Sequence, residues 1–224
     1  ITLTSMTNEE YVRHPKFKVH GLGVKINNEP TKYLTGGALL HFLKTHDWAN
    51  TFAIAHHSHF DGAILTWKAG VKPKFWGCTL SMCRALYPHE SASLANLVKV
   101  LGLPDKGFEL SSVKDKWTLT PEESATLGKY CINDVDITAA AFDIMVKDFP
   151  VAELRVIDTT VRMFTEPELM LDPPLLEEEI AAEIERKQLL LDQIAHEKAD
   201  LMSNDKFAEI LLSLGVDPPK KLSP

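Results

Sequence analysis

Two aspartates in this sequence occupy positions where a carboxylate could do metal or acid–base chemistry. Asp61 ends the segment "HHSHFD", which follows the apolar run "TFAIAH" at the point where a strand should give way to a helix. Asp134 lies four residues after Tyr130 in "YCINDVDIT", inside a segment whose apolar residues recur at helical spacing. Tyr130, Asp134 and Ile137 therefore share one stripe of a predicted helix. Because a buried, unpaired carboxylate is costly, we expect a cationic partner to meet Asp134.

Each aspartate also has a simpler structural interpretation. The partner of Asp134 could be an arginine, a lysine or a helix N-terminus in place of a metal ion. Ser58 and Asp61 fit the Ser-x-x-acid capping box, in which the carboxylate would only satisfy free backbone amides at the start of a helix. Metal coordination is the functional alternative to both.

Three histidines close to Asp61 invite comparison with a zinc site. They are His56, His57 and His59. The alternation of side chains along the end of the strand directs His56 and His57 to opposite sides. The pattern therefore disfavours a histidine zinc site.

The elements that must position Asp61 alternate between strand and helix. Residues 17–26 carry apolar side chains at alternate positions, and after the turn "NNEP" the extended pattern resumes in "TKYL", which predicts a hairpin. Helical spacing in 37–48, a short apolar strand in 51–56 and helical spacing again in 60–70 continue the alternation. This order predicts a mixed α/β sheet with helices packed on it.

Two further helices are marked by their ends. Residues 93–103 form a short apolar helix that Gly102 and Pro104 should close. A long helix should begin after the N-cap Thr120, with Pro121 in its first turn, and end near Pro150. Beyond it the sequence becomes rich in Glu, Leu and Ala, and 173–202 predicts a second long helix. We therefore expect a domain boundary near residue 150, followed by an all-helical extension.

Composition limits the class of protein. Hydrophobic residues make up 45% of the 224, enough for a packed core, and no apolar run reaches about 18 residues, so no membrane span or membrane partner is expected. The N-terminal residues lack a signal-peptide pattern, so we expect a cytoplasmic protein. Cys78, Cys83 and Cys131 show no C-x-x-C spacing and are expected to be reduced, buried thiols.

The formal net charge of −7 argues against a binder that holds nucleic acid by a basic surface alone. It is compatible with a nucleic-acid enzyme, because carboxylates that hold divalent cations reverse the local field.

The order of these motifs resembles a known family. "HFD" after a strand, followed about seventy residues later by Tyr-x-x-x-Asp on a helix, resembles the second and third motifs of the DnaQ-like 3′–5′ exonucleases of the Asp-Glu-Asp-Asp-Tyr type. "TLSMCRALYP" and "SLANLVKVLGL" resemble the segment between those motifs in family A DNA polymerases. "DKFAEILLSLGVDPPKKLSP" resembles the passage into the thumb of these polymerases, especially the phage-type ones. The resemblance covers essentially the whole chain.

This resemblance implies a ribonuclease H-like (DnaQ-like) α/β fold, with a mixed sheet and flanking helices. Residues 1–150 would form the 3′–5′ exonuclease-like domain, and 151–224 a helical linker and the start of the polymerase thumb. The implied activity is proofreading, in which two Mg²⁺ or Mn²⁺ ions promote hydrolysis of the 3′-terminal phosphodiester of single-stranded DNA. The implied partners are a single-stranded 3′ end, primer-template DNA and the rest of the polymerase chain, in the host cytoplasm if the protein is phage-encoded.

The resemblance also assigns roles to individual residues. Asp134 would bind one metal ion, Asp61 would help to hold the other, and Tyr130 would orient the attacking water. His57 and Phe60 would contact the substrate, although Phe60 could equally be a core residue. His57 stands where the family usually has Asn.

One family motif is missing from these 224 residues. No Asp-x-Glu, the first motif of the family, occurs in the sequence, which begins with a stretch that resembles the residues directly after it. The resemblance thus implies that the chain is a fragment with little activity by itself. A catalytically inactive exonuclease-like structural domain and a stand-alone RNA or DNA exonuclease remain as alternatives.

Overall fold

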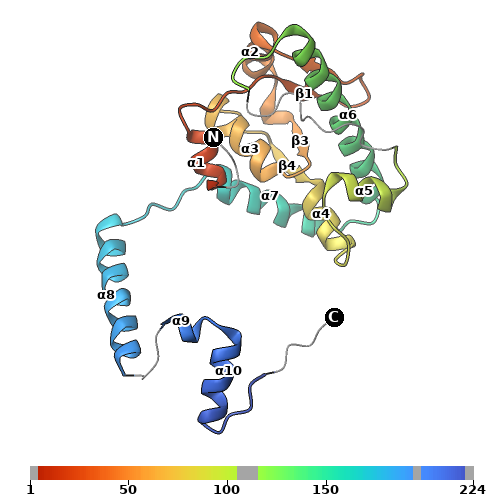
Figure 1. Ribbon diagram of the computed structural model, residues 1–224. Helices are drawn as coiled ribbons and strands as arrows, with labels where there is room; N and C mark the ends of the chain where they lie inside the picture. Colours follow the sequence, from red (N-terminus) through yellow and green to blue (C-terminus); the bar gives the residue numbers. More distant parts are fainter. Residues whose placement is uncertain (1–4, 105–115, 194–197, 220–224) are drawn as a thin grey trace. The chain divides into compact units, whose positions relative to one another are not determined.

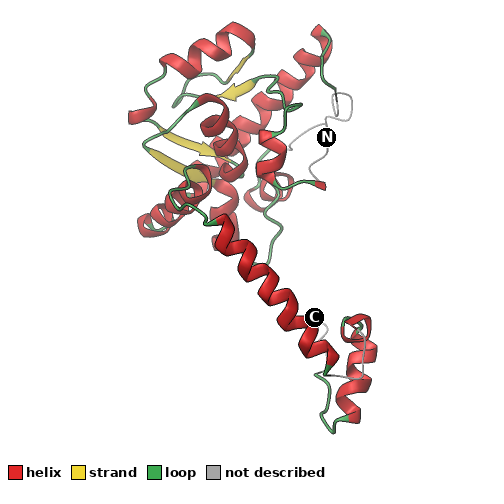
Figure 2. Cartoon of the chain, turned by 90° about the vertical axis from the view of Figure 1, so that its left-hand side faces the viewer, coloured by secondary structure: helices red, strands yellow, loops and turns green. Residues whose placement is uncertain are grey.

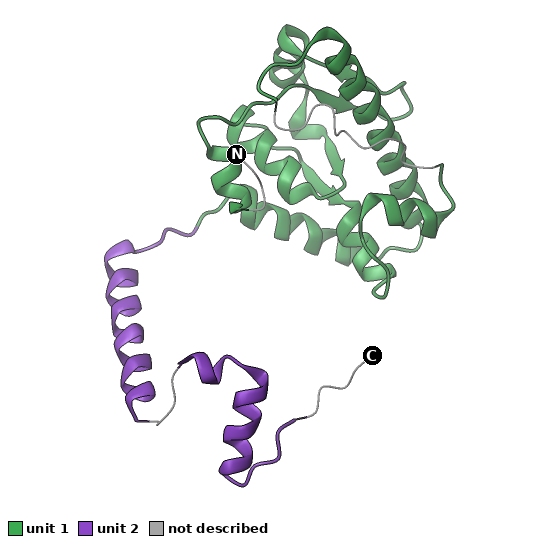
Figure 3. Cartoon of the chain, viewed as in Figure 1, with its two compact units in different colours: residues 1–168 green, residues 169–224 purple. Residues whose placement is uncertain are grey.

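The computed structural model describes residues 5–104, 116–193 and 198–219. These residues form two compact units, which divide between Glu168 and Leu169 and are described separately below (Figure 3). The first unit contains strands β1 (Leu22–Val24), β2 (Lys32–Leu34), β3 (Phe52–Ala55) and β4 (Phe75–Cys78). Its helices are α1 (Asn8–Arg13), α2 (Gly36–Thr45), α3 (Ser58–Ala69), α4 (Thr79–Leu86), α5 (Leu94–Leu101), α6 (Pro121–Met145) and α7 (Val151–Thr165), with a 3-10 turn at Trp48–Asn50.

The strands of the described residues pair as two separate sheets. β1 and β2 form the predicted antiparallel hairpin, with Leu22 opposite Leu34. β3 pairs in parallel with β4, with Ala55 opposite Cys78. The predicted α/β class is confirmed, but the strands are short and surrounded by helices (Figure 2), and the single mixed sheet that we expected is not formed by the described residues.

Helix α6 spans both sheets and follows its predicted start signals. The Thr120 side chain accepts from the amide of Glu123, and the Glu123 side chain accepts from the amide of Thr120, so a full capping box forms. The helix ends at Met145, slightly before Pro150. It packs against β1, β2 and β3, so its inner face can bring residues to both sheets (Figure 1).

The main core lies between β4 and helices α4, α5, α6 and α7. Its most deeply buried members include Trp76, Met82 and Leu97. Two of the three cysteines, Cys78 and Cys83, are buried here as predicted, whereas Cys131 is only partly buried. The helix α5 that contributes Leu97 ends at Gly102 in the left-handed conformation, as its sequence predicted.

Helix α7 belongs to the first unit, which moves the boundary from the expected residue 150 to Glu168. It packs on α3 and β4. An Asp158 carboxylate oxygen accepts from the Trp76 amide at 2.8 Å, and Arg162 donates to the carbonyl oxygens of Pro73 and Lys74 at 2.8 and 3.0 Å. These polar contacts, together with buried Ile157 and Val161, tie α7 to the parallel pair.

The second unit is helical, as expected for the region after the first domain. It contains α8 (Pro173–Asp192), α9 (Lys198–Leu201) and α10 (Asn204–Ser213), none of which has a buried residue. The long helix predicted over 173–202 ends at Asp192, and residues 194–197 of that prediction lie outside the described ranges. Across the described part of both units, no helix has the length and apolar content needed to cross a bilayer.

Candidate active site

A sharp corner between β3 and α3 positions Asp61. His57 lies at this corner as the N-cap of α3, with φ 84° and ψ 53° in the left-handed region. Few side chains tolerate this conformation, and Asn, Asp and His are the ones enriched there. The histidine therefore meets the same backbone requirement that an asparagine would meet, and the corner places Asp61 in the first turn of α3.

The capping-box interpretation of Ser58 and Asp61 is wrong. Ser58 is the first residue of α3, and the helix has no side-chain N-cap hydrogen bond. The Ser58 hydroxyl instead bonds to the carbonyl oxygens of Ala55 and Gly77, and its amide donates to the Cys78 sulfur at 3.4 Å. Ser58 thus fastens the corner to β4, and capping does not account for Asp61.

Burial sets the electrostatic state of Asp61. The residue is only partly exposed, and the loss of water around its carboxyl raises the pKa to about 7. A carboxyl in this state gains more from a nearby cation than one that is fully hydrated, because water does not already stabilise its charge.

Helix α6 brings the second carboxylate to the same place. Tyr130, Cys131 and Asp134 are all partly buried on α6. Burial and, to a smaller extent, the negative charges of Asp134 and Asp61 together raise the pKa of the Cys131 thiol to about 11. Both aspartates therefore lie near one thiol, although they come from helices far apart in the sequence.

The hairpin packs against α6 beside this cluster. A Cβ on Gly23 would lie 3.1 Å from the carbonyl oxygen of Cys131, and one on Gly128 would lie 2.7 Å from the Tyr33 ring. The Tyr33 hydroxyl is buried without a hydrogen-bond partner among the described residues, and burial, followed by the charge of Cys131, raises its pKa. Tyr33 was not predicted as a neighbour of the site, and the signal in the sequence that could have found it is the pair of glycines at 21 and 23, which permit close approach.

Aromatic rings on both sides of His57 form a row at the corner. Phe60 lies 6.2 Å from the Tyr11 ring and 6.3 Å from the His57 ring, to which it is almost parallel at 11°. His57 and His59 are 6.4 Å apart, and His59 is 5.9 Å from Phe164 of α7. Because Phe60 is partly exposed within this row, it is available for contact with a ligand and is not confined to the core.

The three histidines at the corner point to different partners. His56 Nδ1 bonds to the Thr79 hydroxyl at 2.9 Å, while His57 and His59 belong to the aromatic row. Over the ranges that the structure describes, no group of three or more His, Cys, Asp or Glu side chains is arranged to hold a metal ion. Asp61 and Asp134 therefore supply a suitable type of ligand for Mg²⁺ but only part of a complete set.

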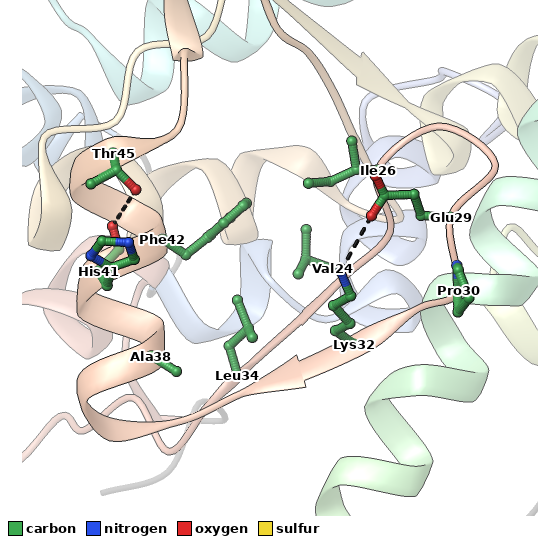
Figure 4. Close-up of a pocket in the computed structure, with 10 residues that line it drawn as sticks. All are labelled: Val24, Ile26, Glu29, Pro30, Lys32, Leu34, Ala38, His41, Phe42 and Thr45. Carbon is green, nitrogen blue, oxygen red and sulfur yellow. Dashed lines mark hydrogen bonds and ion pairs between the residues drawn. The ribbon is translucent and has the colours of Figure 1, made fainter.

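A pocket of about 300 Å³ lies on the other face of the hairpin (Figure 4). Since side chains alternate along a strand, Lys32 and Leu34 face this pocket while Tyr33 faces α6. The one carboxylate that lines it, Glu29, is ion-paired with Lys32 at 3.2 Å. The pocket is thus separate from the aspartates and has no free acidic group.

Comparisons with protein-family models, curated proteins and solved structures found no match to this chain.

Proposed function

We propose that the first unit is a Mg²⁺-dependent 3′–5′ exonuclease domain that acts on single-stranded DNA ends, in a family A DNA polymerase. One observation carries the proposal: the aspartates of the two motifs, Asp61 and Asp134, come from different helices and both lie near Cys131. The helices of the second unit would then be the linker and the start of the polymerase thumb, as the sequence resemblance implies.

The side chains have distinct roles in this proposal. Asp61 and Asp134 would hold Mg²⁺ or Mn²⁺, since hard carboxylate oxygens suit these ions. The metal ions would stabilise the charge on the attacking and leaving oxygens. Tyr130, one turn before Asp134 on α6, would orient the attacking water through its hydroxyl, and Phe60 and His57 would contact the terminal nucleotides.

A catalytically inactive exonuclease-like domain is the second candidate. It is favoured by the absence, within the described residues, of a third side chain that completes a metal site. The two candidates differ in whether the aspartates bind a divalent cation at all.

Hydrolysis of a labelled single strand tests the main proposal. If an Asp-x-Glu precedes Ile1 in the intact protein, the chain extended to include it is used. Asp134→Ala should abolish metal-dependent turnover, and Tyr130→Phe should lower the single-turnover rate by roughly 10- to 1,000-fold. Asp143→Asn is the matched control, because Asp143 is an exposed carboxylate on the same helix, and its rate should equal that of the parent.

Several results would contradict these assignments. A Tyr130→Phe rate within about twofold of the parent would remove Tyr130 from the mechanism. Strong hydrolysis by the 224-residue chain itself, abolished by Asp134→Ala, would show that its own residues already complete the metal site.

Binding of Mn²⁺, followed by electron paramagnetic resonance, separates the two candidates without an activity assay. Asp61→Asn and Asp134→Asn should each weaken binding by tenfold or more, while Asp143→Asn should not change it. If the parent extended to include an upstream Asp-x-Glu binds no Mn²⁺ at millimolar concentration, the inactive domain is the correct description.

A further inference from the structure

Arg84 lies in the last turn of α4, a short helix that begins at the edge of the parallel sheet where the corner of His57 also lies. Helix α4, which carries Arg84, begins directly after β4, just as the corner follows β3. Because β3 and β4 are parallel and Ala55 is opposite Cys78, the two connections leave the same edge of the sheet. The bond between His56 and Thr79 links them directly.

The Arg84 side chain is exposed and takes part in none of the ion pairs found among the described residues. Three other arginines form ion pairs within the described residues: Arg13 with Glu9, Arg162 with Asp158 and Glu166, and Arg186 with Glu183. The acidic group nearest in sequence, Glu90, accepts a hydrogen bond from Asn96 at 3.1 Å. Arg84 therefore presents an available guanidinium at the surface.

Arg84 is also the fixed positive charge beside the two histidines. Burial, and then the charge of Arg84, lowers the pKa of His57; burial, His57 and Arg84 lower the pKa of His59. Arg84, whose guanidinium keeps its charge at any physiological pH, therefore supplies the cation beside these rings. A guanidinium next to a row of partly exposed rings is the combination that single-stranded nucleic acids require, with phosphates on the cation and bases on the rings.

We propose that Arg84 binds a backbone phosphate of the substrate strand, while the rings of His57, Phe60 and Tyr11 stack with its bases. This inference rests on the proposed function, since it names a nucleic acid as the ligand. We assign Arg84 a positioning role on the strand, since it is not one of the two carboxylates proposed to hold the metal ions.

Binding of fluorescein-labelled oligo(dT) to the 224-residue chain, without divalent metal and at several salt concentrations, tests the proposal. Arg84→Gln should weaken binding by roughly 10-fold and reduce the slope of log affinity against log salt by about 0.7, the value for one phosphate contact on a single strand. Arg84→Lys should recover the slope but only part of the affinity, because it keeps the charge and loses the bidentate geometry. Arg155→Gln is the matched control, because Arg155 is also exposed, on α7, and its substitution removes the same charge.

The outcomes are distinguishable. If Arg84→Gln and Arg155→Gln both bind as the parent does, with an unchanged salt slope and an unchanged unfolding midpoint, the role of Arg84 is wrong. If Arg84→Gln loses binding and slope but hydrolysis by the extended chain does not depend on Asp134, the phosphate contact stands and the exonuclease assignment fails. If the parent does not bind oligo(dT), the phosphate contact of Arg84 is wrong, while hydrolysis by the extended chain tests the exonuclease assignment separately.

Discussion

Helices α7 and α8 show how the two compact units differ. Both have apolar residues at helical spacing, but α7 buries Ile157 and Val161 against the first unit, whereas Ile180 and Ile184 of α8 remain 51% and 64% exposed. In the part of the second unit that the structure describes, no side chain is buried. An amphipathic pattern thus predicts a helix reliably, but it does not identify the surface on which the apolar face packs. We therefore expect the first unit to contribute most of the free energy of unfolding of the chain.

The largest effect that separates the units should come from truncating a core side chain. Leu97→Ala removes a fully buried side chain from the main core and should lower the free energy of unfolding by about 2–5 kcal/mol. Ile184→Ala on α8 should change it by less than about 0.5 kcal/mol. Urea unfolding followed by tryptophan fluorescence measures both, because Trp76 lies in the same core as Leu97. Equal losses in the two variants would show that α8 is packed as tightly as α5.

A smaller effect is expected where the hairpin packs on α6. Gly23→Ala places a methyl group 3.1 Å from the Cys131 carbonyl oxygen, a backbone atom that cannot move easily, and should cost about 1–3 kcal/mol. Gly37→Ala is the control, because no atom lies within 4 Å of its Cβ position on α2, and it should be neutral or stabilising. If Gly23→Ala unfolds at the same urea concentration as the parent, the hairpin does not pack closely on α6.

A matched pair of arginines tests which unit α7 belongs to. Arg162→Gln removes an ion pair with Asp158 and donors to two carbonyl oxygens, and should cost about 1–2 kcal/mol after allowance for partial exposure. Arg186→Gln on α8 removes a pair with Glu183 that is exposed on both sides, and should cost less than about 0.5 kcal/mol. Both variants are compared by urea unfolding. Equal effects would place α7 outside the cooperative first unit.

The smallest effect is expected from deleting the second unit. A chain that ends at Glu168 should unfold cooperatively, with a midpoint within about 2 °C of the parent, because the described helices of the deleted unit bury no side chain. Differential scanning calorimetry measures the midpoint. A second cut at residue 150 should abolish cooperative folding, since it removes the contacts of α7 with α3 and β4. Survival of that shorter chain would restore the boundary expected from the sequence.

Local signals predicted several elements correctly. Signals within a few neighbouring residues mark the hairpin, β3, α5 and α6. Side chains alternate along the strands, Thr120 and Glu123 cap the start of α6, and Gly102 ends α5. β4 was not predicted, because "FWGC" is short, does not alternate, and becomes a strand through its pairing with β3. The boundary was placed too early for a similar reason: α7 belongs to the first unit through Asp158 and Arg162, whose partners lie more than eighty residues away in sequence.

The candidate site likewise contains residues that the sequence indicated and contacts that only the tertiary structure shows. Residue type and spacing marked Asp61 and Asp134 as candidates beside simpler structural interpretations, and the family resemblance added the role of Tyr130, because short motifs of this kind lie within a few positions of one chain segment. Only the tertiary structure decided that Ser58 bonds to β4 and does not cap α3, that Cys131 lies near both aspartates, and that Arg84 lies beside His57 and His59. These contacts form between segments that are far apart in the sequence. The free energy that stabilises them comes from burial and from hydrogen bonds between those segments, so no local sequence pattern predicts them.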